Sequence, residues 1–142
     1  MRAVVTRVRS ASVEIEGKIN GSIGQGYLVL LGVGPEDTEE QAVRLAEKIC
    51  NLRVFEDEQG KMNLNLESVG GALLVVSQFT LYADLRSRRP GFSHAAKPAQ
   101  AIPLYEYFME QCRSRGFHVE PAAFGADMQG ASSDDGPVPV LF

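Results

Sequence analysis

The seven residues from Tyr27 to Val33 form an uninterrupted apolar run, and this run constrains the fold more than any other feature. It is far shorter than the roughly 18 residues that cross a bilayer, and it has the length of a strand. Gly24 and Gly26 mark its entry. A strand without polar alternation is covered on both faces. The run therefore predicts a central strand of a layered protein.

Other segments have the two-residue periodicity of half-buried strands. Val4, Thr6 and Val8 alternate with their neighbours, as Val13 and Ile15 do further on. Gly17-Lys18 then looks like a hairpin turn. Later strands are predicted from Val54-Phe55, from Met62 to Leu66 and from Ala72 to Val76, followed by an extended tail from Phe117 to Phe142 with turns at Gly130 and at 134–137.

Two segments have helical periodicity. The first begins at Asp37-Thr38, where Thr38 and Gln41 form a capping-box pattern. The second runs from about Pro98 to Arg115, and Pro103 predicts a late start or a kink because it lacks a backbone donor. Gly116 is a suitable stop. The apolar faces consist of Ala42, Leu45, Ala46 and Ile49 in the first helix and Ala101, Leu104, Tyr105, Phe108 and Cys112 in the second.

The order of elements predicts a mixed α/β fold, with helices covering a sheet in a single domain spanning 1–142. The N-terminus has no apolar signal region, so we expect a cytosolic protein with no membrane partner. A net charge of −4 argues against coating nucleic acid, but it leaves room for a local basic patch. Cys50 and Cys112 are expected to be reduced core residues, and the spacing of His94 and His118 favours no metal site.

The first candidate site is the end of the strand that reaches Val76. The residues that follow it are Ser77, Gln78, Phe79 and Thr80. Polar groups at the end of an apolar strand are where α/β folds place ligands. A hydroxyl nucleophile needs a base, and nothing marks either histidine for that role. The hydroxyls are therefore interpreted as positioning groups, and backbone N–H groups as donors to an oxyanion. The alternative is the solvent face of a continuing strand.

The second candidate is the polar loop from Asp84 to Lys97. Its cations are Arg86, Arg88, Arg89 and Lys97, with Phe92 and His94 between them. Clustered cations with interleaved rings are typical of phosphate contact and base stacking. An ordinary solvated loop is the alternative.

The third candidate is the segment Asp134–Val138, which contains Gly136-Pro137. On pattern alone it is an ordinary turn with a trans bond, because only about 5–6% of X-Pro bonds are cis.

Taken together, the whole chain resembles the D-aminoacyl-tRNA deacylases. The resemblance is strongest at Ser77–Leu81, the first signature of that family. It extends over Met1–Val8, Gly60–Asn65, Arg89-Pro90 with Phe92-Ser93, Leu104–Phe108 and Phe124–Met128. The family's second signature usually reads Asn-x-Gly-Pro-Val-Thr, and this chain has Asp134 and Pro139 at the first and last of these positions.

The resemblance implies a homodimer with a barrel-like mixed sheet, two helices on one face and an active site at the subunit interface. It implies that Ser77–Thr80 hold the ester of an aminoacyl-tRNA, with the Phe79 N–H on its carbonyl. Water would attack with help from the terminal ribose 2′-OH, without metal or cofactor. The resemblance also implies a cis bond at Gly136-Pro137. Gly136, Pro137 and Val138 of the partner would exclude L side chains, while D-aminoacyl-tRNA and glycyl-tRNA mischarged on tRNA-Ala are accepted.

Three other interpretations stay open from the sequence. One is a sibling deacylase that clears a mischarged L-amino acid and has a trans Gly-Pro. That relative, however, lacks the Ser77-Gln78-Phe79 triplet. The others are a noncatalytic module that binds the tRNA end and a hydrolase of small esters.

Overall fold

The apolar run forms strand β3 (Gly26–Gly32) in the middle of a mixed six-stranded sheet. The structure is a computed structural model that describes residues 1–122 and 128–141, and for 128–139 the backbone strand without its side chains. β3 lies antiparallel to β1 (Arg2–Ile15) and parallel to β6 (Ala72–Ser77), which is parallel to β7 (Val119–Ala122). The prediction of a central strand is confirmed.

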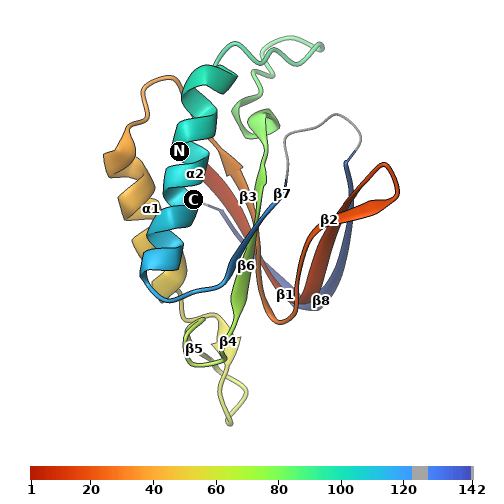
Figure 1. Ribbon diagram of the computed structural model, residues 1–142, viewed down its shortest axis with the longest axis vertical. Helices are drawn as coiled ribbons and strands as arrows, with labels where there is room; N and C mark the ends of the chain where they lie inside the picture. Colours follow the sequence, from red (N-terminus) through yellow and green to blue (C-terminus); the bar gives the residue numbers. More distant parts are fainter. Residues whose placement is uncertain (123–127, 142) are drawn as a thin grey trace.

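The sheet curls into a nearly closed, barrel-like form because β1 is long enough to pair with three strands (Figure 1). Its first half pairs with β3, its second half pairs with β2 (Lys18–Ile23), and β8 (Met128–Leu141) follows it over most of its length. Ile15 pairs with Lys18, and the turn between them has positive φ at Glu16 and Gly17, 51° and 78°, so the predicted hairpin is confirmed with its turn one residue earlier.

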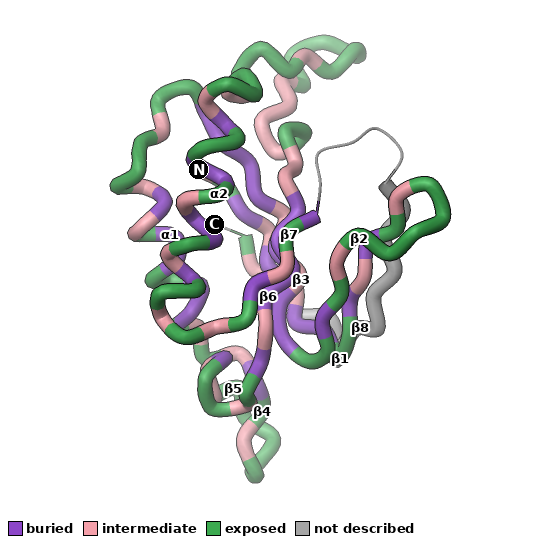
Figure 2. The backbone as a smooth tube through the Cα atoms, in the orientation of Figure 1, coloured by how far each residue is buried: buried purple, intermediate pink, exposed green. Residues whose placement is uncertain are grey.

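Helices α1 (Glu39–Asn51) and α2 (Pro98–Ser114) lie side by side on one face of the sheet (Figure 1). The capping box of Thr38 and Gln41 forms as predicted. Buried segments of the strands line the space under both helices (Figure 2). Tyr27, Val29 and Leu31 face this helix-covered core, whereas Leu28 and Leu30 pack against the apolar interior of the barrel. One face of β3 is therefore buried and the other is half-buried.

The two cysteines meet between the helices. Cys50 and Cys112 are both buried and free, as predicted. A hydrogen bond with the Cys50 thiol, followed by burial, raises the pKa of the Cys112 thiol well above its ordinary value. The Cys112 thiol is therefore not a nucleophile at neutral pH.

Several sequence predictions are wrong in detail. α2 begins at Pro98, as the predicted range has it, and the late start is wrong, because the helix runs through Pro103 at the cost of one backbone donor. Gly130 forms no turn, because it pairs with Val13 inside β8. Met62 is 58% exposed, because it belongs to a small separate hairpin of β4 (Phe55–Glu56) and β5 (Met62–Leu64). Among the described residues, no helix has the length and apolar character needed to cross a membrane.

Candidate active site at the end of β6

The chain turns sharply where β6 ends. Ser77 is half-buried and pairs with Leu31, and the Gln78 N–H donates to the Leu31 carbonyl at 2.8 Å. A single 3₁₀ turn, η1 (Phe79–Tyr82), follows at once. The alternative of a continuing strand is therefore wrong for Phe79 and Thr80. The turn lifts the Phe79 side chain out of the sheet, and it is 56% exposed.

The start of η1 leaves two backbone donors available. A helix cannot satisfy its first N–H groups internally. Within residues 1–122 and 128–141, the N–H groups of Phe79 and Thr80 have no hydrogen-bond acceptor. Two such donors on one turn can hold a carbonyl oxygen as it gains negative charge.

The side chains around this turn contain no paired nucleophile and base. The Thr80 hydroxyl oxygen accepts a hydrogen bond from the Gln78 amide. His94 lies 3.4 Å from Asp84, and His118 lies 2.8 Å from Glu120. In the part of the chain that the structure describes, neither imidazole bonds to Ser77 or Thr80, and no three His, Cys, Asp or Glu side chains form a metal site. The hydroxyls are thus suited to positioning.

A ring contact joins the strand end to the basic loop. Phe79 and Phe92 meet edge to face, with centroids 5.0 Å apart and planes at 80°. The loop returns to the strand end because Asp84 and Gly91 exchange two backbone hydrogen bonds of 2.7 and 3.0 Å. The structure therefore brings the first two candidate sites together, which no local sequence pattern indicates.

The four predicted cations differ in their surroundings. Arg86 forms an ion pair with Asp84 at 2.7 Å, and its hydrogen bonds lower the pKa of the Asp84 carboxyl to about 2. Arg88, Arg89 and Lys97 are exposed and form no ion pair with any described residue. These three cations are available to phosphate, whereas Arg86 already has a carboxylate partner.

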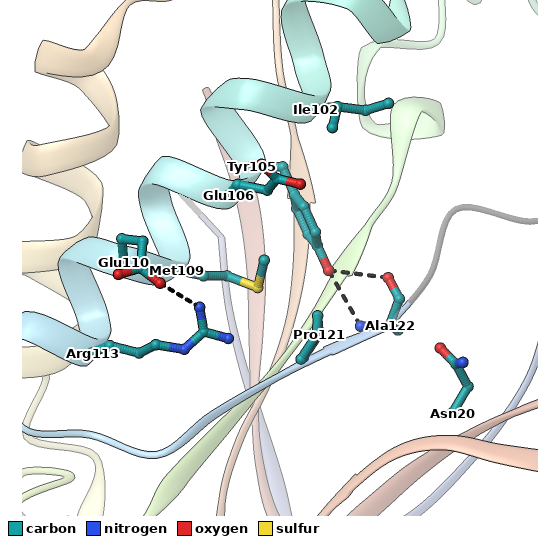
Figure 3. Close-up of a pocket in the computed structure, with 9 residues that line it drawn as sticks. All are labelled: Asn20, Ile102, Tyr105, Glu106, Met109, Glu110, Arg113, Pro121 and Ala122. Carbon is teal, nitrogen blue, oxygen red and sulfur yellow. Dashed lines mark hydrogen bonds and ion pairs between the residues drawn. The ribbon is translucent and has the colours of Figure 1, made fainter.

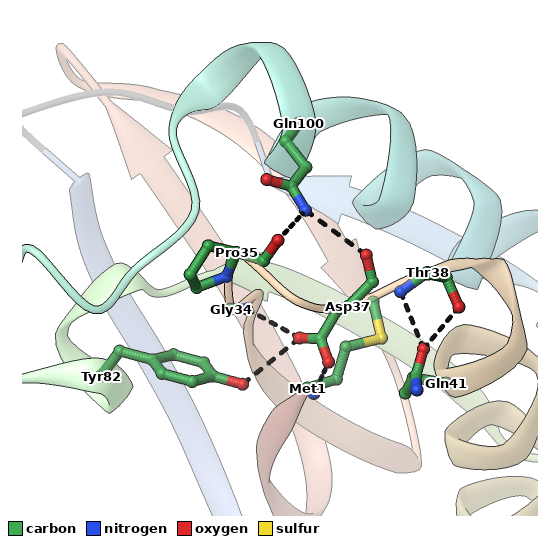
Figure 4. A network of polar contacts seen from close by, with 8 residues as sticks. All are labelled: Met1, Gly34, Pro35, Asp37, Thr38, Gln41, Tyr82 and Gln100. Atoms are coloured by element: carbon green, nitrogen blue, oxygen red, sulfur yellow. Dashed lines mark hydrogen bonds and ion pairs between the residues drawn. The ribbon is translucent and has the colours of Figure 1, made fainter.

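A polar network below η1 holds its C-terminal end (Figure 4). The Tyr82 hydroxyl lies 3.4 Å from Asp37 Oδ2, which also accepts the Gly34 N–H at 2.7 Å. Burial, followed by the nearby Asp37 charge, raises the pKa of Tyr82 to about 12. Arg2 covers the ring of Tyr82 at 4.4 Å. No sequence pattern marks these residues as part of a site, and the only signal is the position of Tyr82 directly after Ser77–Leu81.

Gly136-Pro137 lies where β8 leaves the ladder with β1. Val8 pairs with Asp134 and Thr6 with Pro139, so residues 135–138 bulge opposite Arg7. The predicted turn is therefore a bulge within a strand. None of the described peptide bonds is cis, so the cis bond implied by the resemblance is not found at Gly136-Pro137. Across the sheet, Arg7 aligns with Tyr27 and then with Leu73, four residues before Ser77. The path from the bulge to Ser77 crosses from β8 over β1 and β3 to β6, which is three strand spacings, and then runs four residues along β6. Measured over the sheet, the two points are about 19 Å apart.

A pocket of about 600 Å³ opens between α2 and β7 (Figure 3). Its floor includes Ala122, which pairs with Val76 immediately before Ser77. Tyr105 links α2 to this edge, because its hydroxyl lies 2.5 Å from the Val75 carbonyl oxygen and 3.1 Å from that of Ala122. The pocket thus borders the strand end. Its lining residues are Asn20, Ile102, Tyr105, Glu106, Met109, Glu110, Arg113, Pro121 and Ala122.

Comparison with known proteins decides the family. The family model described as D-Tyr-tRNA(Tyr) deacylase matches residues 4–142. A D-aminoacyl-tRNA deacylase from Thermus aquaticus is 56% identical over 99% of this chain and 93% of its own length. The chain belongs to the D-aminoacyl-tRNA deacylase family. Another relative of that name, from Symbiobacterium thermophilum, is 55% identical over 99% of this chain and 94% of its own.

Solved structures agree with the family's fold. A structure described as c-Myc DNA unwinding element binding protein has a TM-score of 0.93 and 41% identity, covering 100% of this chain and 97% of that one. A probable eukaryotic D-amino acid tRNA deacylase has a TM-score of 0.84 over 99% of this chain and 97% of its own. Its 15% identity supports the fold alone. The family and the barrel-like fold predicted from the sequence are confirmed.

Proposed function

We propose that this protein hydrolyses the ester bond of D-aminoacyl-tRNA and releases free D-amino acid and tRNA, as a proofreading step in translation. The observation that carries the proposal is the 3₁₀ turn after Ser77, with two available backbone donors beside Phe92 and the basic loop. It occurs in a chain of the D-aminoacyl-tRNA deacylase family, which makes the protein an ester hydrolase. Because aminoacyl-tRNA is a cytosolic substrate, we place the protein in the cytosol.

The proposed chemistry uses the backbone rather than a side-chain nucleophile. The ester carbonyl oxygen lies at the Phe79 N–H, which stabilises the oxyanion of the tetrahedral intermediate. Water attacks the carbonyl carbon, assisted by the terminal ribose 2′-OH of the tRNA. Ser77, Gln78 and Thr80 orient the ester and the water. The lack of a base beside either hydroxyl, among the described residues, supports this route.

The tRNA end is held by the loop from Asp84 to Lys97. Arg88, Arg89 and Lys97 meet phosphates, and the exposed rings of Phe79 and Phe92 offer faces and edges to nucleotide bases. Arg86 contributes less charge because Asp84 already pairs with it. The local patch explains how a chain of net charge −4 can bind one RNA end.

Chirality is selected by Gly136-Pro137 of a second subunit. Within one chain the bulge is about 19 Å from Ser77 over the sheet, so it is far from its own strand end. A homodimer would bring the partner's Gly-Pro backbone to the ester, where its carbonyls meet the substrate amino group and leave no room for an L side chain. Glycine has no side chain, so glycyl-tRNA mischarged on tRNA-Ala would also be accepted.

The reaction class is tested with three substrates. D-tyrosyl-tRNA, D-tyrosyl-tRNA ending in 2′-deoxyadenosine linked through its 3′-OH, and the ethyl ester of D-tyrosine are each incubated with purified protein. We expect hydrolysis of the first, slow hydrolysis of the second with retained binding, and none of the third. Rapid hydrolysis of the ethyl ester would indicate a small-ester hydrolase. Tight binding of D-tyrosyl-tRNA without turnover would indicate a noncatalytic module.

The selectivity motif is tested by Gly136→Ala. The added methyl group would displace the proposed carbonyl pair, so hydrolysis of L-tyrosyl-tRNA should rise relative to the D ester. An unchanged ratio of the D-ester to the L-ester hydrolysis rate would contradict a role of Gly136 in chiral selection. Sedimentation of the active protein as a monomer would contradict the role of a partner subunit.

A further inference from the structure

The first strand of the protein reaches the site through Arg2. Its guanidinium Nη1 donates to the Leu81 carbonyl at 2.8 Å. The guanidinium carbon also lies 4.4 Å from the centroid of the Tyr82 ring, which is a cation–π contact. Leu81 and Tyr82 are the last two residues of η1. One side chain of β1 therefore contacts the proposed catalytic turn twice.

Tyr82 is fixed from a second direction by the segment that leaves β3. Its hydroxyl faces Asp37, whose carboxylate accepts the Gly34 N–H and pairs with the Met1 ammonium at 2.6 Å (Figure 4). Gly34 allows this approach, since a Cβ there would lie 3.0 Å from the Tyr82 ring. The ring is thus confined by Arg2, Asp37 and Gly34.

The turn needs such external support because it has few bonds of its own. Leu81 N–H bonds to the Gln78 carbonyl at 3.4 Å, and Ala83 N–H bonds to the Thr80 carbonyl at 3.1 Å. Runs of 3₁₀ helix are short and have poor hydrogen-bond geometry. Backbone donors stabilise an oxyanion only when they are held in position before the reaction.

We propose that Arg2, together with Asp37 and Tyr82, is a positioning residue that fixes the orientation of η1 and hence of the Phe79 and Thr80 N–H groups. The proposal rests on the proposed function for its kinetic consequence. None of the three needs to touch the substrate. Their effect passes through Leu81 and Tyr82 to the start of the same turn.

The test compares Arg2→Ala with Arg44→Ala. Arg44 is the matched control, because it is an exposed arginine on α1 with an ion pair to Glu40 and no contact with η1. We expect Arg2→Ala to lower kcat on D-tyrosyl-tRNA about tenfold with little change in KM, within the roughly hundredfold that a misplacement of about 1 Å can cost. Arg2→Lys should fall between, because an ammonium cannot reproduce the planar stack. Tyr82→Phe keeps the ring and should lose less than Tyr82→Ala.

A second readout is independent of activity. The amide NMR shifts of Phe79 and Thr80 should move in Arg2→Ala and stay in place in Arg44→Ala, with both variants folded by circular dichroism. Unchanged amide shifts of Phe79 and Thr80 in Arg2→Ala would overturn the positioning role. This readout does not depend on activity, so it applies even if the native protein does not hydrolyse D-tyrosyl-tRNA. An effect on KM alone would also overturn the positioning role and make Arg2 an RNA contact. If Arg2→Ala does not fold, the positioning role is tested with Tyr82→Phe, by measuring kcat on D-tyrosyl-tRNA and the amide shifts of Phe79 and Thr80.

Discussion

The ring of Phe79 meets the ring of Phe92 edge to face at 5.0 Å, and this contact connects the end of β6 to the basic loop. Phe79 belongs to the turn with the available backbone donors, and Phe92 follows the hairpin closed by Asp84 and Gly91. Both rings are substantially exposed, at 56% and 41%. Large apolar rings exposed side by side typically mark a binding surface.

Phe92→Ala tests this contact. Removing the ring should raise KM for D-tyrosyl-tRNA about three- to tenfold, because an aromatic pair contributes roughly 0.5–1.5 kcal/mol and the base loses a stacking partner. Steady-state kinetics on the tRNA substrate measure it, with Phe92→Tyr as the matched control. Kinetics unchanged from the native protein would separate the loop from the site.

Thr80→Ala tests the absence of a side-chain nucleophile. The hydroxyl accepts a bond from the Gln78 amide and has no base among the described residues, so we expect kcat to fall by less than about fivefold. Loss of a true nucleophile costs several orders of magnitude. Complete loss of activity in a folded variant would restore the nucleophile mechanism.

Arg88→Glu tests the basic loop. This exposed arginine has no carboxylate partner in the described chain, so reversing its charge should weaken tRNA binding. The slope of log Kd against log salt should fall by about one for each phosphate that the variant no longer binds. Binding measured over a salt series gives both quantities, and Arg44→Glu is the control. Equal affinities for the two variants at low salt would make the loop ordinary solvated surface.

Alkaline pH should weaken the link between α2 and the sheet. Burial raises the pKa of Tyr105 to about 12 from an ordinary value near 10. The folded state thus retains a proton that the unfolded state loses, so stability is full below pH about 10 and falls as pH rises toward 12. The free energy of unfolding should drop by roughly 2–3 kcal/mol from this residue. Urea denaturation over this range should show a smaller drop in Tyr105→Phe, and equal drops would contradict the assignment.

The parts of the fold that could be predicted depend on neighbours in sequence. Thr38 and Gln41 are one helical turn apart, so their capping box can be recognised in the sequence. The apolar run Tyr27–Val33 likewise indicates a central strand, and Tyr27, Val29, Leu31 and Val33 are buried. The prediction of a turn at Gly130 is wrong because strand register, not residue type, determines the structure there. Glycine is common in turns, but here Gly130 pairs with Val13 and is part of a strand.

The candidate site likewise has a part that the sequence predicts and a part that depends on the fold. Ser77–Thr80 could be selected because polar residues interrupt an apolar strand, whereas their contact with Phe92 depends on how a distant hairpin folds back. Arg2 and Tyr82 lie far apart in the sequence, and only the β1–β3–η1 arrangement joins them. Family resemblance supplied the reaction class, which periodicity cannot provide.

The central claim is hydrolysis of a D-aminoacyl ester on tRNA, and the most direct measurement compares D-tyrosyl-tRNA with L-tyrosyl-tRNA. Purified protein without added metal should release tyrosine rapidly from the D ester and leave the L ester intact. Hydrolysis of both would keep the hydrolase and attribute the lost selectivity to Asp134 and Pro139, where the chain departs from its family's second signature. An intact D ester after incubation with folded protein would contradict the account.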